Sequence, residues 1–187
     1  MSVSLVGIVN TALDHIGQSP ITSLSEANPV AEKARRLLPG TLNFVLRAHL
    51  WKFAQKRVAL AKLKATPAFG YQAQFQLPTD FIRLVKCEPD VPFTVEGRKI
   101  LCDSPRLAIV YVGHCADPSL FDDAFREALE LKLAANMAYG STASGGLAES
   151  LNTRYLAAVR EARGYDAREG EGQKFPASAW AAAKLGR

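Results

Sequence analysis

The sequence predicts an α+β fold, mainly α, in which a core like a four-helix bundle carries an inserted small antiparallel β-sheet. Two observations predict it. Apolar residues recur at three- and four-residue spacing in four segments, and the middle of the chain changes to the two-residue alternation of strands. With 187 residues, 48% of them hydrophobic, the chain can bury a core without disulfides.

The four helices are predicted over residues 3–17, 28–50, 118–139 and 146–168. The pairs Asn28-Pro29 and Asp117-Pro118 each place a capping side chain before a proline at the first helical position. Pro39 lies inside the second segment, so we expect a kink or a break there. The third segment is apolar on most of its faces, and we expect it at the centre of the bundle.

The β insertion is predicted over about residues 56–113. In Tyr71–Leu77, apolar residues alternate with three glutamines, which is the pattern of a strand with one solvated face. Two short apolar runs flank Glu96-Gly97-Arg98-Lys99, a glycine-bearing hairpin turn. The other strand candidates are 57–63, 81–87 and 106–113.

Residues 1–169 are therefore expected to form one folded unit, and residues 170–187 an extended C-terminal tail. The tail lacks the apolar content to fold alone, yet it contains two large aromatic residues, Phe175 and Trp180. No run of about 18 apolar residues predicts a membrane span. The N-terminus also lacks the pattern of a signal peptide, so we expect an intracellular protein with no membrane partner.

Motifs for catalysis, cofactors and metals are missing from the sequence. It has no Gly-rich phosphate loop and no Gly-x-Ser-x-Gly turn, and its three histidines fall in different predicted elements. The three cysteines have no close pair, and His114 beside Cys115 lacks a second ligand pair, so incidental side chains explain them better than a metal site. Asp122-Asp123 at a helix start is explained by the helix dipole. We expect no enzyme, cofactor or metal site.

The charge distribution is asymmetric along the chain. Residues 28–64 contain nine Lys and Arg against one acidic residue, whereas the remaining residues contain 14 basic and 17 acidic ones. Such asymmetry indicates either a nearby polyanion or an acidic partner surface, and a solvated helix face explains it equally well.

Six pieces of the chain occur in an order and spacing typical of one family. They are the N-terminal helix with Ile21-Thr22-Ser23-Leu24, the segment ending Trp51-Lys52-Phe53-Ala54, the run from Tyr71 into Pro78-Thr79-Asp80-Phe81, the hairpin Glu96-Gly97-Arg98-Lys99, the helix entry Asp117-Pro118-Ser119-Leu120-Phe121-Asp122, and Trp180. Together they resemble the podophage tail tubular protein A family and the related head-to-tail adaptors of tailed bacteriophages. The resemblance covers nearly the whole chain.

The resemblance implies a structural virion protein at the capsid–tail junction, present in the host cytoplasm during assembly. It implies a ring, commonly of twelve copies, bound beneath the dodecameric portal. That ring extends the channel for double-stranded DNA and meets the tail nozzle or the next tail protein. A head-to-tail interface closes into a ring when its rotation closes.

On this basis three sets of residues are predicted to carry the function. Trp51 and Phe53 pack the helices against the sheet. The tail docks to the portal or to a neighbouring copy through Phe175, Trp180, Leu185 and Arg187, with the aromatic residues as anchors. The candidates for contacts to the DNA channel or between subunits are Lys33, Arg35, Arg36, Lys56, Arg57, Lys62 and Lys64.

Three alternatives stay open at this point. A free DNA-binding protein would use the basic 28–64 segment, although no clean helix-turn-helix register is present. A small enzyme would need a substrate-sized polar pocket with perturbed ionisable groups. A head-completion or neck protein of a long-tailed phage would differ mainly in tail type.

Overall fold

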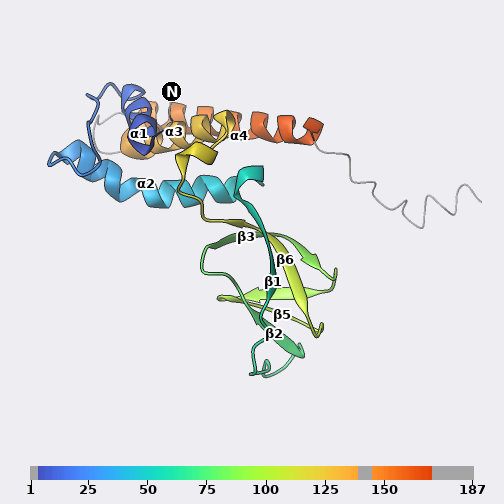
Figure 1. Cartoon of the computed structure of the whole chain (residues 1–187). Helices are drawn as coiled ribbons and strands as arrows, with labels where there is room; N and C mark the ends of the chain where they lie inside the picture. Colours follow the sequence, from blue (N-terminus) through green and yellow to red (C-terminus); the bar gives the residue numbers. More distant parts are fainter. Residues whose placement is uncertain (1–3, 139–144, 170–187) are drawn as a thin grey trace, which may run out of the picture.

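The computed structural model describes residues 4–138 and 145–169, and it consists of a helical body and a β body (Figure 1). The helical body is made of α1 (Leu5–Asp14), α2 (Pro29–Ala48), α3 (Asp123–Ala138) and α4 (Gly145–Glu169). The β body is made of β1 (Gln55–Leu60), β2 (Ala73–Gln76), β3 (Phe81–Glu88), β4 (Phe93–Glu96), β5 (Lys99–Cys102) and β6 (Leu107–Gly113). The α+β class and the β insertion between the second and third helices match the prediction.

Short polar side chains start the helices. Ser4 caps α1 through the amide of Gly7, and Asn28 caps α2 by accepting a 2.7 Å hydrogen bond from the amide of Ala31. Asp117-Pro118 begins only a short 3-10 turn, Pro118–Leu120, so the predicted start of α3 at residue 118 is wrong. The carboxylate of Asp122 caps α3 instead, at 2.7 Å from the amide of Phe125.

Pro39 does not break α2, which continues from Pro29 to Ala48. The proline lies on an exposed face of the helix, where water can satisfy the carbonyl that loses its amide partner. Two residues later the hydroxyl of Thr41 donates to the carbonyl of Leu37 at 2.9 Å. The expected break at this position is therefore absent.

The β insertion forms two three-stranded antiparallel sheets where one was predicted. One sheet has the order β1-β6-β3 and the other has the order β2-β5-β4. The chain crosses between them just after β1, where Lys62 forms a bridge with Phe75 of the second sheet. The apolar faces of both sheets contribute to one core cluster, so each sheet buries its inner face against the other.

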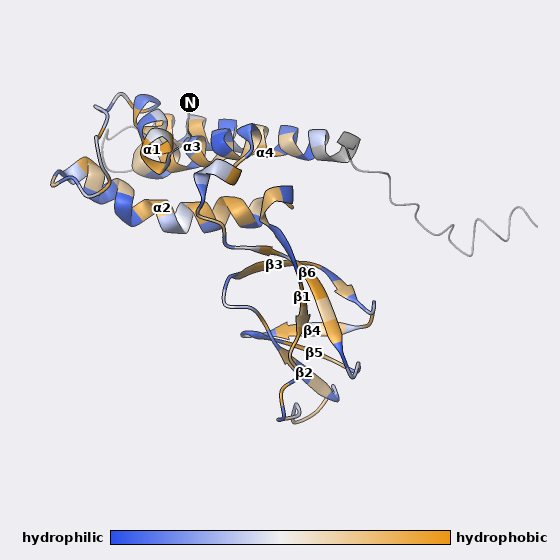
Figure 2. Ribbon diagram, in the orientation of Figure 1, coloured by the Kyte–Doolittle hydropathy of each residue, from blue (hydrophilic) through white to orange (hydrophobic). Residues whose placement is uncertain are grey.

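A second, larger core holds the helical body together. All four helices contribute to it, and α3 contributes the most buried residues, including Phe125, Leu129 and Leu133. Neighbouring residues of β6 point into different cores, because Tyr111 belongs to the sheet core and Val112 to the helical core. The end of β6 at Val112 thus lies where the two bodies join, and this strand is largely hydrophobic (Figure 2). Among the described helices, none is long and apolar enough to cross a membrane.

Glu130 on α3 is an acidic residue whose ionisation opposes folding. Burial raises its pKa to about 7, the nearby charge of Glu127 adds to this rise, and Arg126 opposes it. The folded protein therefore holds this proton more tightly than the unfolded chain does, and the stability falls as the pH rises from about 4.5 to 7.

We expect Glu130→Gln to stabilise the protein by about 1 kcal/mol at pH 8, which is the value of the shift reduced for partial solvent screening. At pH 4 the gain should vanish, because the wild-type carboxyl is then protonated in both states. Urea unfolding at the two pH values measures the difference. Glu149→Gln, at an exposed position on α4, is the control, and an equal gain at both pH values would contradict the burial argument.

Candidate interaction surfaces

Aromatic side chains cluster where the chain passes from the helical body to the β body, a place we call the joint. Trp51 is only 2% exposed, its indole nitrogen donates to the carbonyl of Val45 at 2.8 Å, and its ring meets that of Phe125 edge-on with centroids 5.0 Å apart. Phe53 packs against Phe125 and Phe121 with centroids 4.9 and 5.5 Å apart. The structure thus places the predicted pair where helix gives way to strand.

A partly exposed polar network centred on Asp80 lies beside this joint. The ammonium group of Lys56 lies 2.6 Å from one carboxylate oxygen, and the hydroxyl of Tyr111 donates to the other at 3.0 Å. Burial pushes the pKa of Asp80 upward, but the hydrogen bonds and charge of these partners outweigh it, so the pKa is lowered. Burial and the same carboxylate raise the pKa of Tyr111 to about 12.

The backbone around Asp80 is equally constrained. The Asp80 carbonyl accepts a 2.7 Å hydrogen bond from the amide of His114. A Cβ atom on Gly113 would lie 2.8 Å from the Asp80 carboxylate and 2.9 Å from the Lys56 side chain, so a larger residue here would displace the Lys56–Asp80 pair. The Pro78-Thr79-Asp80-Phe81 turn therefore ties β1, β3 and β6 together. The sequence marked this turn by its motif but gave Asp80 no role.

The seven predicted basic residues do not form one patch. Lys33, Arg35 and Arg36 lie on α2, whereas the other four lie on β1 and the chain that follows it. Two of the seven are engaged within the chain, because Lys33 donates to the carbonyl of Met137 at 2.6 Å and Lys56 pairs with Asp80. The exposed members of the set are Arg35, Arg36, Lys56, Arg57, Lys62 and Lys64. The predicted docking residues Phe175, Trp180, Leu185 and Arg187 lie outside the described residues.

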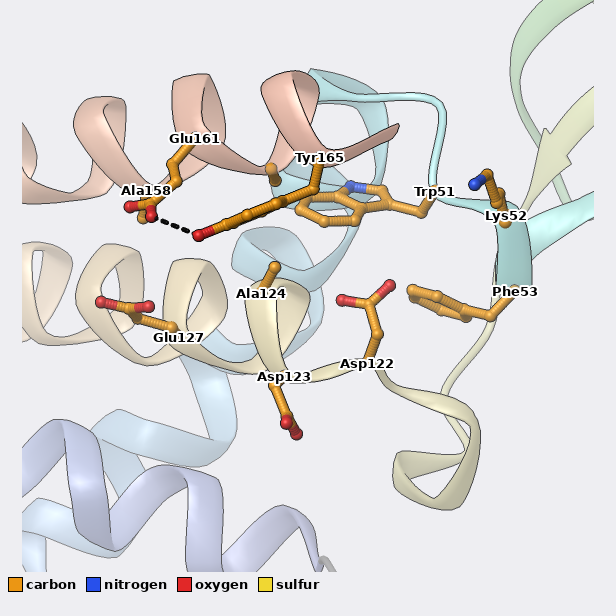
Figure 3. A pocket seen from close by; sticks show the side chains of 11 residues that line it. Trp51, Lys52, Phe53, Asp122, Asp123, Ala124, Glu127, Ala158, Glu161 and Tyr165 are labelled. Atoms are coloured by element: carbon orange, nitrogen blue, oxygen red, sulfur yellow. Dashed lines mark hydrogen bonds between the residues drawn. The ribbon is translucent and has the colours of Figure 1, made fainter. Parts of the chain in front are cut away.

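A groove of about 620 Å³ opens between the start of α3, the end of α4 and the aromatic joint (Figure 3). We call it the joint groove. Its lining residues are Trp51, Lys52, Phe53, Asp122, Asp123, Ala124, Glu127, Ala158, Glu161, Ala162 and Tyr165. The apolar members come from all three elements, and four of the five charged members are carboxylates. An apolar floor with an acidic rim suits a ligand that is both apolar and cationic.

The ring of Tyr165 lies between α3 and α4 in Figure 3. Its hydroxyl donates to a carboxylate oxygen of Glu161 at 2.8 Å, and the side chain is still 52% exposed. The carboxylate of Asp122 is held by its capping bond to α3. Hydrogen bonds within the chain thus hold Asp122, Glu161 and Tyr165 in place at the rim before any partner binds.

The joint groove was not predicted from the sequence. The available signal was the α4 stripe, in which Ala158, Ala162 and Tyr165 continue the apolar spacing. Ala162 is buried in the helical core and Ala158 packs partly against it, whereas Tyr165 is 52% exposed beside the groove. In the described part of the chain, no group of three or more His, Cys, Asp or Glu side chains could hold a metal ion.

Comparison with known proteins identifies the family. The family model described as tail tubular protein matches residues 6–104, more than half of the 187 residues. The matched stretch contains α1, α2 and β1 to β5, and with them Trp51, Phe53 and the Asp80 turn. No curated protein matches the chain. The chain therefore belongs to the tail tubular protein family, whose members are structural, non-enzymatic proteins of the bacteriophage virion.

Proposed function

We propose that this protein is a head-to-tail adaptor. Its copies close into a ring of twelve beneath the portal, and the ring extends the DNA channel and joins the capsid to the tail. Membership of the tail tubular protein family supports a structural place in the virion.

The observation that carries the proposal is the presence of two unlike surfaces on one chain. The helical body has the joint groove with its four carboxylates, and the β body has the exposed cations Arg57, Lys62 and Lys64. A head-to-tail contact needs different, complementary surfaces on the two sides of a subunit, whereas a two-fold dimer needs one self-complementary surface. Surfaces of opposite charge at different places on one chain suit the first arrangement.

The placement of the basic residues favours passage of DNA over its capture. A DNA-binding protein gains affinity by neutralising many phosphates with one continuous basic surface. Here the seven predicted cations divide between two bodies, and Lys33 and Lys56 already have partners in the chain. A channel wall with scattered exposed cations holds double-stranded DNA weakly and without sequence preference, as passage requires.

Co-sedimentation with the candidate portal ring, followed by imaging of the complex, tests the proposal. We expect the full-length protein to bind as a symmetric collar and to extend the central channel. A chain lacking residues 173–187 is expected to stay folded and to lose the collar. Absence of portal association in the full-length chain, together with tight and steeply salt-dependent binding to DNA, would contradict the adaptor function.

A further inference from the structure

We propose that the joint groove binds residues 173–187 of a second copy of the chain. Each copy would then hold the next one by its C-terminal segment. This inference rests on the proposed ring, and it assigns the contact that links neighbouring copies. The segment lies outside the described residues, so the argument uses its sequence and the groove that would receive it.

The floor of the joint groove can accept apolar side chains. Phe53 and the three alanines Ala124, Ala158 and Ala162 line it beside Trp51, and its volume of about 620 Å³ is in the range of pockets that bury a compact ligand. The segment 173–187 offers two large aromatic residues, Phe175 and Trp180, separated by small residues. Aromatic anchors in partly preformed pockets are the usual centres of binding energy at interfaces.

The charges of the two partners are complementary. The rim carries Asp122, Asp123, Glu127 and Glu161, with Lys52 as the single cation of the lining. Between residues 173 and 187 the chain has three cations, Lys174, Lys184 and Arg187, and no acidic residue. Opposite charges of this kind speed the encounter and fix the register of a contact.

The position of the end of α4 favours a second copy over the segment's own groove. Tyr165 lines the groove, and α4 runs on to Glu169, about 6 Å further along its axis at 1.5 Å per residue. Figure 1 shows this end of α4 projecting beyond α3. Helix α4 therefore ends past the groove. A segment that follows it reaches its own groove only by turning back along α4, whereas binding to a neighbour's groove does not require that turn.

Mixing two complementary variants tests the contact without the portal. The first variant, Glu127→Lys with Glu161→Lys, keeps the segment and reverses two exposed rim charges. The second variant lacks residues 173–187 and keeps the groove. We expect each to stay monomeric alone in sedimentation velocity and the mixture to form a one-to-one pair, because only the mixture contains one intact groove and one segment.

Three results would overturn the proposal. One is a mixture that stays monomeric, as it would if the segment bound only the portal. Another is a wild type that stays monomeric while the mixture pairs, because the segment would then fold onto its own groove. The third is self-association of the rim variant that equals that of a self-associating wild type. A matched double variant, Glu88→Lys with Glu149→Lys, changes the charge equally at exposed sites away from the groove and should associate like the wild type.

A synthetic peptide of residues 173–187 gives a second measurement. Titrated against the truncated chain, it should bind at least tenfold more tightly than to a truncated chain that also carries the two rim changes, and the difference should shrink with added salt. Equal binding to both would also overturn the proposal. Portal co-sedimentation is scored separately, so a failed groove contact and a failed adaptor function give different results.

Discussion

Trp51→Ala is expected to lower the free energy of unfolding by about 3–5 kcal/mol, the usual cost of removing a buried aromatic side chain. The indole is 2% exposed and fills the space between Phe125 and His49 at the junction of the two bodies. Its removal leaves a cavity there and also leaves the carbonyl of Val45 without its 2.8 Å hydrogen bond. Both losses fall on the segment that joins α2 to β1.

Urea unfolding followed by circular dichroism measures this loss. Phe69→Ala is the matched control, because Phe69 is 88% exposed and its removal should change the free energy of unfolding by less than about 0.5 kcal/mol. Trp51→Phe should cost less than Trp51→Ala, because it keeps part of the ring volume and loses the hydrogen bond. A Trp51→Ala protein as stable as the wild type would show that the joint does not depend on this ring.

Local patterns in the sequence predicted the elements well where a local interaction decides them. The Asn28 cap and the following proline set the start of α2, and glutamine alternation marked β2. The predictions failed where contacts with residues distant in the sequence determine how an element begins or continues. Asp117-Pro118 is an equally good local signal, but the chain turns again, and Asp122 starts α3 next to the aromatic cluster. Pro39 is tolerated because tertiary packing on the other face of α2 keeps the helix continuous.

The number of sheets could not be predicted for a similar reason. Each strand shows one apolar face, but the alternation does not say which other strand completes that face. In the structure β6 pairs with β1 on one side and with β3 on the other, so both of its edges are occupied. The remaining strands, β2, β5 and β4, form a second sheet that packs against the first. Only long-range pairing carries this information.

For the interaction surfaces too, residues with a local signal were predicted and residues that depend on distant partners were missed. Trp51 and Phe53 were predicted for the joint because large aromatic residues at a helix end are usually core. Asp80 and the joint groove were missed, because their partners are far apart in sequence. Lys56 and Tyr111 reach Asp80 from 24 and 31 residues away. Glu127 and Glu161 come from two different helices.

Asp80→Ala is expected to cost about 2 kcal/mol at pH 7, because it removes one charge-assisted hydrogen bond and leaves a buried hydroxyl without its acceptor. Lys56 would lose its ion partner, and Tyr111, which is 5% exposed, would lose the carboxylate it donates to. The folded-state pKa of Asp80 lies below its unfolded value, so its contribution is present above about pH 4 and is lost as the pH falls through the folded pKa.

The difference in stability between wild type and Asp80→Ala should therefore be largest near neutral pH and should shrink below about pH 4. Urea unfolding at pH 7 and pH 3 measures it. Glu88→Gln is the control, because the Lys86–Glu88 pair is exposed on both sides and should be worth less than about 0.5 kcal/mol. A deficit that stayed constant down to pH 3 would mean that Asp80 acts through packing alone. The charge network would then not be what ties β1, β3 and β6 together at the joint.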